Sequence, residues 1–412
     1  MPFLTSGVFR KLFSDAFFSI LASIALKALP FVSGSLLLRF LGDAGLAAQN
    51  SYYVLLTLFT TIATGGLGPF LLYHFSKENT SGDHREIDSL WTASILIYHF
   101  SFAAALAIVY TTTPTGNLWS ILLSAYFATS LFFVLIRENG LKNYRRVFGV
   151  SSVWSIAILA LLAGFSWAGF AAINSVTASY GIASFMATTW LLATQSRAQV
   201  SWRPHMSKSS FWSLAGYTAT QILTVGSIFY ALAYVRGNHD HSSFNNIIFC
   251  YQLYTLIVFL PGLLANVTIP HAAITKQGTA NRTWFSYLPA LYAAFGTLSF
   301  AAIAVFLPLL VKLYGLTNFD YSWDNYLILA TAVPSSVIAG ANQLSVARND
   351  AMQPTLIAMI FAILFAVSFL LSILIDHFGT TLFISITFAS ILNIVTMSIR
   401  RDKTSAAIGE SK

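Results

Sequence analysis

The chain has 412 residues, of which 56% are hydrophobic and only 9% are charged, with a mean hydropathy of +0.70 and a formal net charge of +8. A soluble domain has roughly 25% charged residues, so this composition excludes an ordinary soluble fold. In a membrane protein, a net positive charge reflects loop residues that set orientation, and we therefore expect no nucleic-acid partner.

The first apolar segment, from about residue 13 to residue 38, is not expected to be a cleaved signal peptide. It is too long, it has no small-residue cleavage site, and many further apolar segments follow it. The single cysteine, Cys250, excludes an internal disulfide framework and a cysteine-based metal centre. We expect no cofactor and no metal.

Apolar stretches of about 20 residues recur along the whole chain, and each is long enough to cross a bilayer core of ~30 Å. We predict an all-α polytopic membrane protein with twelve transmembrane helices. Only "SWAG", residues 166–169, separates the fifth span from the sixth, so we expect a tight external turn there. In chain order the predicted spans cover residues 14–38, 46–74, 90–110, 118–136, 147–167, 170–193, 211–235, 246–271, 285–311, 324–346, 355–375 and 381–399.

The distribution of basic residues sets the orientation of these spans. If the N-terminus is placed inside, the inner segments hold 18 of the 22 Lys and Arg residues. Arg39, Arg236 and Lys312 then fall at outer ends, and Lys27 falls within the membrane. By the positive-inside rule, a bias of this size predicts that both termini are cytoplasmic.

The longest predicted loop, from Ala193 to Ser210, divides the spans into two sets of six. "SYYVLLTLFTTIATGGLGPFLLYHFSK", which ends at Lys77, resembles "CYQLYTLIVFLPGLLANVTIPHAAITK", which ends at Lys276. Two apolar helices can look alike through composition alone, but the offset of 199 residues agrees with six spans in each half. We expect two six-helix lobes, residues 1–200 and 201–412, around a central cavity, as in transporters with parallel repeats.

The first span carries a polar stripe on one helical face. Lys27, in the middle of this stripe, lies ~20 Å into the span, too deep for its side chain to reach the interface easily. Lys27 is either paired internally with a carboxylate or with helix carbonyl groups, or it binds an anion in a cavity. No Asp or Glu lies near a membrane midpoint, which favours the anion site. The stripe consists of Asp15, Ser19, Ser23, Lys27, Pro30 and Gly34.

The second, seventh and eighth spans carry similar polar stripes. A single Ser or Thr in a membrane helix usually packs or bonds across helices. Stripes on the first two spans and on the two spans that correspond to them in the second half are better explained by one shared cavity. The predicted substrate-binding residues are Lys27, Gln49, Tyr53, Thr57, Tyr217, Gln221 and Asn266.

Three segments resemble Wzx-type O-antigen flippases and related polysaccharide exporters: "SGSLLLRFLGDAGLAAQNSYYVLLTLFTTIATGGLG", "VFLPGLLANVTIPHAAITK" and "NYLILATAVPSSVIAGANQLSVARNDAMQPTLIAMI". The wider MOP superfamily also contains lipid II flippases and MATE antiporters. The resemblance implies two six-helix lobes around a cationic cavity, which here has only Lys27 as a clear cation, because the seventh span is neutral around Thr224 and Gly226.

The resemblance also implies a function and a location. The expected activity is transfer of undecaprenyl-diphosphate-linked oligosaccharide from the cytoplasmic to the periplasmic leaflet of the bacterial inner membrane, by alternating access. The expected partners are this lipid-linked substrate and membrane lipids, with polysaccharide polymerase or chain-length proteins as candidates. We expect the protein to be a monomer.

Two other functions compete with this one. A MATE-like multidrug or cation antiporter would need a membrane carboxylate, which the sequence lacks at mid-depth. A membrane polysaccharide polymerase or glycosyltransferase would need acid and base groups in a large loop, and the loops here are short. HExxH, GxSxG and P-loop motifs are absent, so we do not expect an enzyme.

Reporter fusions test the predicted topology. Fusions at Ser81, Lys142 and Gln277 should report the cytoplasm, and fusions at Thr113, His239 and Phe319 should report the periplasm, because of the bias in basic residues. A periplasmic signal from Lys142 would overturn the twelve-span arrangement.

Overall fold

The computed structural model describes residues 7–81, 84–112, 118–194, 206–238, 241–258, 269, 288–347, 350–375 and 377–409. Within these ranges every regular element is helical. The elements are α1 (Gly7–Thr64), α2 (Leu67–Ser81), α3 (His84–Thr112), α4 (Leu118–Gly140), α5 (Tyr144–Trp167), α6 (Ala172–Ala193), α7 (Lys208–Gln221), the π-helix η2 (Ile222–Gly226), α8 (Ser227–Asn238), α9 (His241–Ile257), α12 (Leu288–Tyr314), α13 (Trp323–Ala330), α14 (Ala332–Ala347), α15 (Met352–Ile375) and α16 (Phe378–Gly409).

The helices have the length and composition of a multi-pass membrane protein. Ten candidate spans are found among the described residues, and the first of them, Phe17–Thr64, is 48 residues long. A helix of that length would measure ~70 Å, more than twice the bilayer core, so it holds two crossings. The 17-residue helix α9 leads into residues 259–268, which lie outside the described part, and accounts for a further crossing. The described helices are roughly consistent with the twelve predicted crossings.

The first two crossings fold back on each other at Gly42. Its backbone has φ 63° and ψ −158°, a conformation that is essentially restricted to glycine. The amide of Gln49 donates to the hydroxyl of Ser33 at 2.9 Å, although residues 16 positions apart in a straight helix would be ~24 Å apart. The chain therefore reverses at Gly42, where the sequence predicts an external connection.

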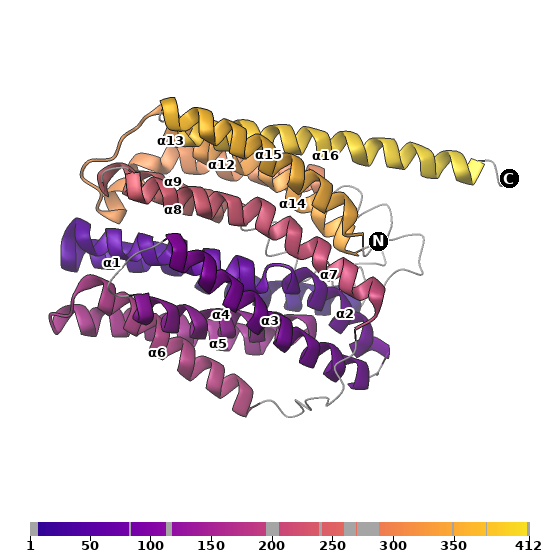
Figure 1. Cartoon of the computed structure of the whole chain (residues 1–412), viewed down its shortest axis with the longest axis horizontal. Helices are drawn as coiled ribbons and strands as arrows, with labels where there is room; N and C mark the ends of the chain where they lie inside the picture. The colour runs from indigo at the N-terminus through magenta and orange to yellow at the C-terminus, as the bar shows by residue number, and fades with distance from the viewer. Residues whose placement is uncertain are drawn as a thin grey trace.

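The described helices form two groups, which lie one below the other in Figure 1. In the first group, Ser155 of α5 donates to the carbonyl of Ala25 in α1, and Phe127 of α4 packs on Phe185 of α6. We call α1–α6 the first lobe and α7–α16 the second lobe. The predicted division at residues 200 and 201 lies outside the described residues and stays a prediction.

The second lobe is held by polar contacts between its own helices. Tyr292 of α12 donates to Gln343 of α14, and Gln353 of α15 donates to Asn393 of α16. The carboxylate of Asp324, at the start of α13, accepts the backbone N–H groups of Gly379 and Thr380 at 2.7 and 2.8 Å. Asp324 thus caps the N-terminus of α16, where backbone donors have no partner in the helix.

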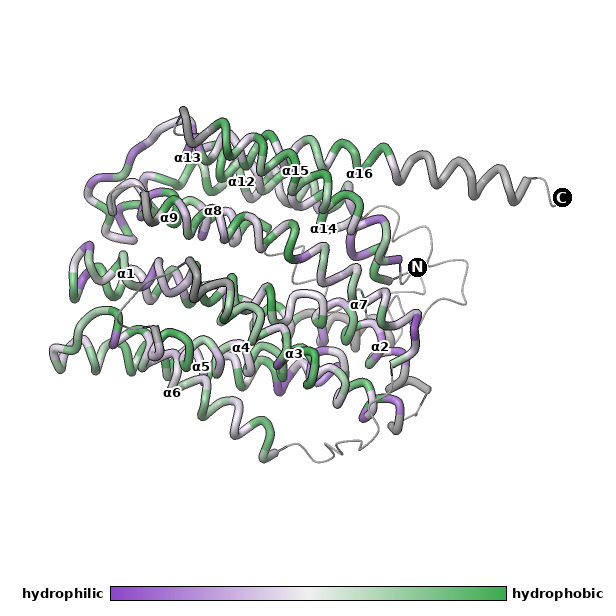
Figure 2. Tube along the Cα trace, in the orientation of Figure 1, coloured by the Kyte–Doolittle hydropathy of each residue, from purple (hydrophilic) through white to green (hydrophobic). Residues whose placement is uncertain are grey.

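Hydrophobic residues predominate along the helices, whereas hydrophilic residues gather toward the ends of the bundle (Figure 2). The described ends of the chain lie on the same side of the molecule, where α2 and the start of α7 are also found (Figure 1). This placement agrees with an even number of crossings.

The structure refines the predicted spans at four places. The turn at "SWAG" is confirmed, with α5 ending at Trp167, Gly169 at φ 80° and α6 beginning at Ala172. The predicted seventh span is not one α-helix, because η2 interrupts it between α7 and α8. The predicted tenth span is found as one crossing, Trp323–Val346, with a one-residue turn at Thr331 between α13 and α14. The predicted second span, 46–74, is not one helix, because a turn at Gly65 and Gly66 separates α1 from α2.

Replacing Gly42 tests the fold-back. Gly42→Ala should lower the melting temperature of the purified protein, because the backbone conformation at this position is strained by about 1–3 kcal/mol for a residue with a Cβ. Gly149→Ala is the matched control, since Gly149 is helical and a Cβ there meets no atom within 4 Å. Equal melting temperatures for the two variants would contradict the account of Gly42.

Candidate functional site

The two lobes touch closely on the side of the molecule where Gly42 lies. The ring of Phe31 in α1 lies 5.8 Å from that of Phe249 in α9 and 4.7 Å from that of Tyr314 in α12, measured between centroids. Arg39 donates to the carbonyl of Leu313 at 3.1 Å. A Cβ on Gly34 would collide with the hydroxyl of Tyr314, so α1 and α12 approach each other at a distance that a larger residue would prevent.

Lys27 lies on the same face of α1 as this contact, one turn closer to the middle of the membrane. Phe31 and Gly34 are four and seven residues further along, spacings that keep side chains on one helical face. Both contact the second lobe, whereas the side chain of Lys27 is exposed. Lys27 thus points toward the interface between the lobes. It lies one helical turn further from Gly42 than the contact that Phe31 makes with the second lobe.

The second crossing presents a parallel stripe to the second lobe. Asn50, Tyr53 and Thr57 share one face of α1, at spacings of three and four residues. Tyr53 packs edge-on against Phe229 of α8 at 5.9 Å, and its hydroxyl is within hydrogen-bonding reach of Thr57 and of Thr255 in α9. Thr57 and Lys27 are both 15 residues from Gly42, so they lie at a similar depth, ~22 Å from the turn.

A second contact between the lobes lies further from Gly42. Gly65 and Gly66, which connect α1 to α2, lie directly against Gln221 and Thr218 of α7, and a Cβ on Gly65 would be 2.7 Å from Cβ of Gln221. Tyr217, one turn before Gln221, is buried, and its hydroxyl has no partner among the described residues. These contacts and those near Gly42 lie at different depths, with Lys27 at an intermediate depth.

The predicted site residues therefore fall into separate places. Lys27, Tyr53 and Thr57 lie at similar depths on the surfaces of α1 that face the second lobe. Tyr217 and Gln221 lie on α7, at or near the contact with Gly65 and Gly66. Gln49 is fully buried inside the first lobe, where its amide donates to Ser33 and Tyr180. Asn266 lies outside the described residues. A role in substrate binding stays a prediction for all seven residues.

The predicted site residues do not include the amide side chains that join the lobes. The amide of Asn50 donates to Asn245 of α9, and Gln252 of α9 donates to Asn50. The one available signal is that asparagine and glutamine are costly in a membrane helix unless another helix supplies a partner. The aromatic contacts of Phe31 and Tyr314 carry no such signal, because these residue types also face lipid.

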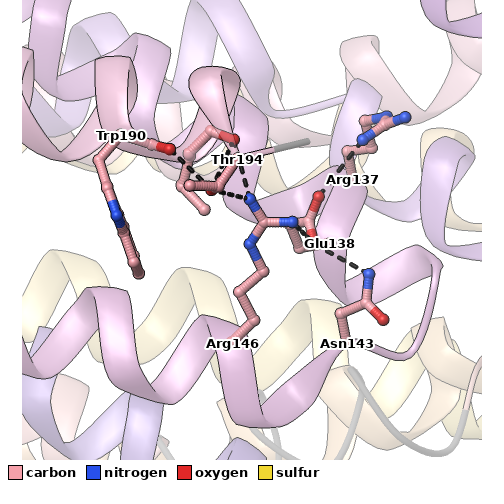
Figure 3. A network of polar contacts seen from close by, with 7 residues as sticks. Arg137, Glu138, Asn143, Arg146, Trp190 and Thr194 are labelled. Carbon is pink, nitrogen blue, oxygen red and sulfur yellow. Dashed lines mark hydrogen bonds and ion pairs between the residues drawn. The ribbon is translucent and has the colours of Figure 1, made fainter. Parts of the chain in front are cut away.

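Charged residues form a buried network where α4 ends and α5 begins (Figure 3). The carboxylate of Glu138 contacts Arg137 at 3.3 Å and Arg146 at 3.6 Å, and it accepts the amide of Asn143 at 2.9 Å. Arg146 also donates to the carbonyl of Leu191 in the last turn of α6. A cation at this position compensates the unpaired carbonyl groups of a helix C-terminus. The network therefore fastens α6 to the turn between α4 and α5.

No protein family and no curated protein matches the sequence. Solved structures do share its fold, and each of the following is a MATE transporter. The chain matches a mutant of the Vibrio cholerae MATE transporter VcmN with a TM-score of 0.71 and 15% identity, over 95% of this chain and 97% of that one. It matches the MATE multidrug transporter DinF-BH with a TM-score of 0.72 and 15% identity, over 96% and 97% of the two chains.

A third match is the outward-facing conformation of a multidrug resistance MATE family transporter of the MOP superfamily, with a TM-score of 0.70 and 11% identity over 99% and 98% of the two chains. At such identities the likeness shows the fold alone. The chain thus has the fold of MATE transporters, as the resemblance to the MOP superfamily implied. None of these structures supports the narrower expectation of an O-antigen flippase.

Removing the carboxylate at the centre of the charged network should destabilise the protein strongly. Glu138→Ala leaves the buried guanidinium of Arg137 without the carboxylate that it contacts, at a cost of about 3–5 kcal/mol. Asp43→Ala removes an exposed carboxylate and is the control. Thermal unfolding of the purified proteins measures the melting temperature of each variant. If Glu138→Ala melts at the same temperature as the parent protein, the network has no structural role.

Proposed function

We propose that this chain is a membrane transporter that works by alternating access between its two lobes and that Lys27 binds an anionic group of the substrate. The observation that carries the proposal is the exposed Lys27 at mid-depth on the face of α1 that meets the second lobe. An unpaired cation near a bilayer centre is unfavourable by about 2.5–3.5 kcal/mol, which argues for a functional partner.

The substrate class follows from the chemistry around Lys27. An ammonium group binds phosphate as a point charge, and the neighbouring Tyr53 and Thr57 offer hydroxyl groups for a polar headgroup. A lipid-linked oligosaccharide diphosphate combines both features. A membrane potential that is negative inside favours outward movement of an anion, by ~2.3 kcal/mol per charge per 100 mV.

The contacts near Gly42 support alternating access. They close the lobes on the predicted external side, through the ring of Tyr314 against Gly34 and Phe31 and through the amides of Asn50 and Asn245. Release of a substrate from Lys27 to that side requires these contacts to separate. None of them is an ion pair, so the separation does not strand a buried charge.

A MATE-like multidrug or cation antiporter is the second candidate, and the fold comparisons favour it over a lipid flippase. A cationic substrate calls for a carboxylate at the interface between the lobes. In the part of the chain that the structure describes, Asp and Glu lie toward the ends of the crossings, and Asp15 is 12 residues, ~18 Å, away from Lys27 along α1. Because of this charge pattern, we favour an anionic substrate over a cationic one.

Substitution of Lys27 tests the proposal. Lys27→Ala and Lys27→Glu should abolish surface polysaccharide in a deletion strain of the host, while Lys27→Arg should retain part of it, because charge matters more than shape in binding a phosphate. Lys312→Ala removes an exposed lysine at the end of α12 and should complement fully. Immunoblots establish that each variant reaches the membrane.

Full complementation by Lys27→Ala would contradict the anion site. Export of a fluorescent cationic dye, measured in the same strains, separates the two candidates. The MATE-like function predicts dye export that does not depend on Lys27, and the proposed function predicts none.

A further inference from the structure

The amide groups of Asn50, Asn245 and Gln252 form a cluster in the interface between the lobes, which we call the amide cluster. Their exposed fractions are 0%, 2% and 3%. Nδ2 of Asn50 donates to Oδ1 of Asn245 at 2.9 Å, and Nε2 of Gln252 donates to Oδ1 of Asn50 at 3.3 Å. The cluster thus spans the two lobes and carries no charge.

The hydrogen bonds of this cluster are incomplete. Oε1 of Gln252 is buried and has no partner among the described residues. If the amide of Gln252 is rotated by half a turn, its NH2 group takes the place of Oε1 and is then the group without a hydrogen-bond partner. An unsatisfied buried acceptor is unfavourable, and an apolar side chain of the same shape would pack here without that penalty. Stability alone therefore does not account for glutamine at this position.

The cluster lies on the path that leads outward from Lys27. Asn50 is eight residues from Gly42 and Lys27 is 15, so along the helix axes the cluster lies ~10 Å closer to the turn. Asn50 shares its helical face with Tyr53 and Thr57, which are near the depth of Lys27. A substrate that is held at Lys27 and released on the side of Gly42 has to pass between Asn50 and Asn245.

Separation of the lobes leaves the amides without partners. Asn50 then loses both of its hydrogen bonds, and Asn245 and Gln252 each lose one. A hydroxyl group both donates and accepts, so a ligand that is rich in hydroxyl groups can replace each broken bond and also satisfy Oε1 of Gln252. An apolar organic cation offers no such replacement, and sites built for hydrogen bonding strongly reject ligands that leave their groups unpaired.

We propose that Asn50, Asn245 and Gln252 form a subsite for the hydroxyl-rich part of the substrate, which takes over their hydrogen bonds as the lobes separate. The proposal rests on the proposed function, because it assumes that Lys27 holds the anionic part of the same molecule. It assigns the cluster a second role besides closing the lobes.

Binding of two lipids to the purified full-length protein in nanodiscs tests this subsite. The probes are undecaprenyl diphosphate and the same lipid carrying a disaccharide. The parent protein should bind the disaccharide form about tenfold more tightly, as expected for one or two additional hydrogen bonds. Gln252→Met keeps the shape of the side chain, so its melting temperature should equal or exceed that of the parent, while its preference for the disaccharide should fall to about onefold to threefold.

Gln343→Met is the matched control. Gln343 is a buried glutamine that bonds to Tyr292 within the second lobe, so its loss should leave the preference for the disaccharide unchanged. An unchanged preference in Gln252→Met and in Asn245→Leu would overturn the subsite, as would the absence of any preference in the parent. Failure of the bare diphosphate lipid to bind, or binding that Lys27→Ala does not weaken, would instead contradict the proposed function.

Discussion

The absence of water from the bilayer core governs the arrangement of this protein. Backbone groups find their partners within helices, and polar side chains must turn toward protein or toward a cavity. The amide NH2 of Gln49 donates to Ser33 and Tyr180 inside the first lobe, and the amide of Asn50 donates to Asn245 across the interface. Lys27 stands apart, because it is a charged group that the fold leaves exposed at mid-depth.

Much of the architecture could be predicted from the sequence because it depends on local properties. Apolar length indicated the crossings, and "SWAG" indicated the turn between α5 and α6. The pairing of helices could not be predicted, because it depends on which surfaces meet after folding. Asn50 was overlooked for that reason, and so was the insertion of Tyr314 against Gly34. The π-helix η2 was missed because the segment is as apolar and helix-compatible as its neighbours.

Fold and substrate are separate questions in this protein. The chain shares its overall arrangement with multidrug MATE transporters, yet a fold accommodates different functions through the residues at its site. Here the lobe-facing stripes of α1 present an ammonium group, hydroxyl groups and amides. That combination suits an anionic, hydroxylated ligand better than a hydrophobic cation. The π-helix η2 interrupts the seventh crossing, in the lobe that faces Lys27. Such π-helical segments are frequent at functional sites.

The central claim is that Lys27 faces water between the lobes and not lipid, and cysteine labelling tests it most directly. Cys250 is buried and is first replaced by alanine, and Lys27→Cys is then compared with Val32→Cys. Val32 is an exposed apolar residue five positions further along α1, which places it about 140° around the helix from Lys27. A water-soluble, membrane-impermeant thiol reagent applied to the protein in inside-out and right-side-out vesicles should label position 27 from at least one side and position 32 from neither. Labelling of neither position, or of position 32 alone, would contradict the account.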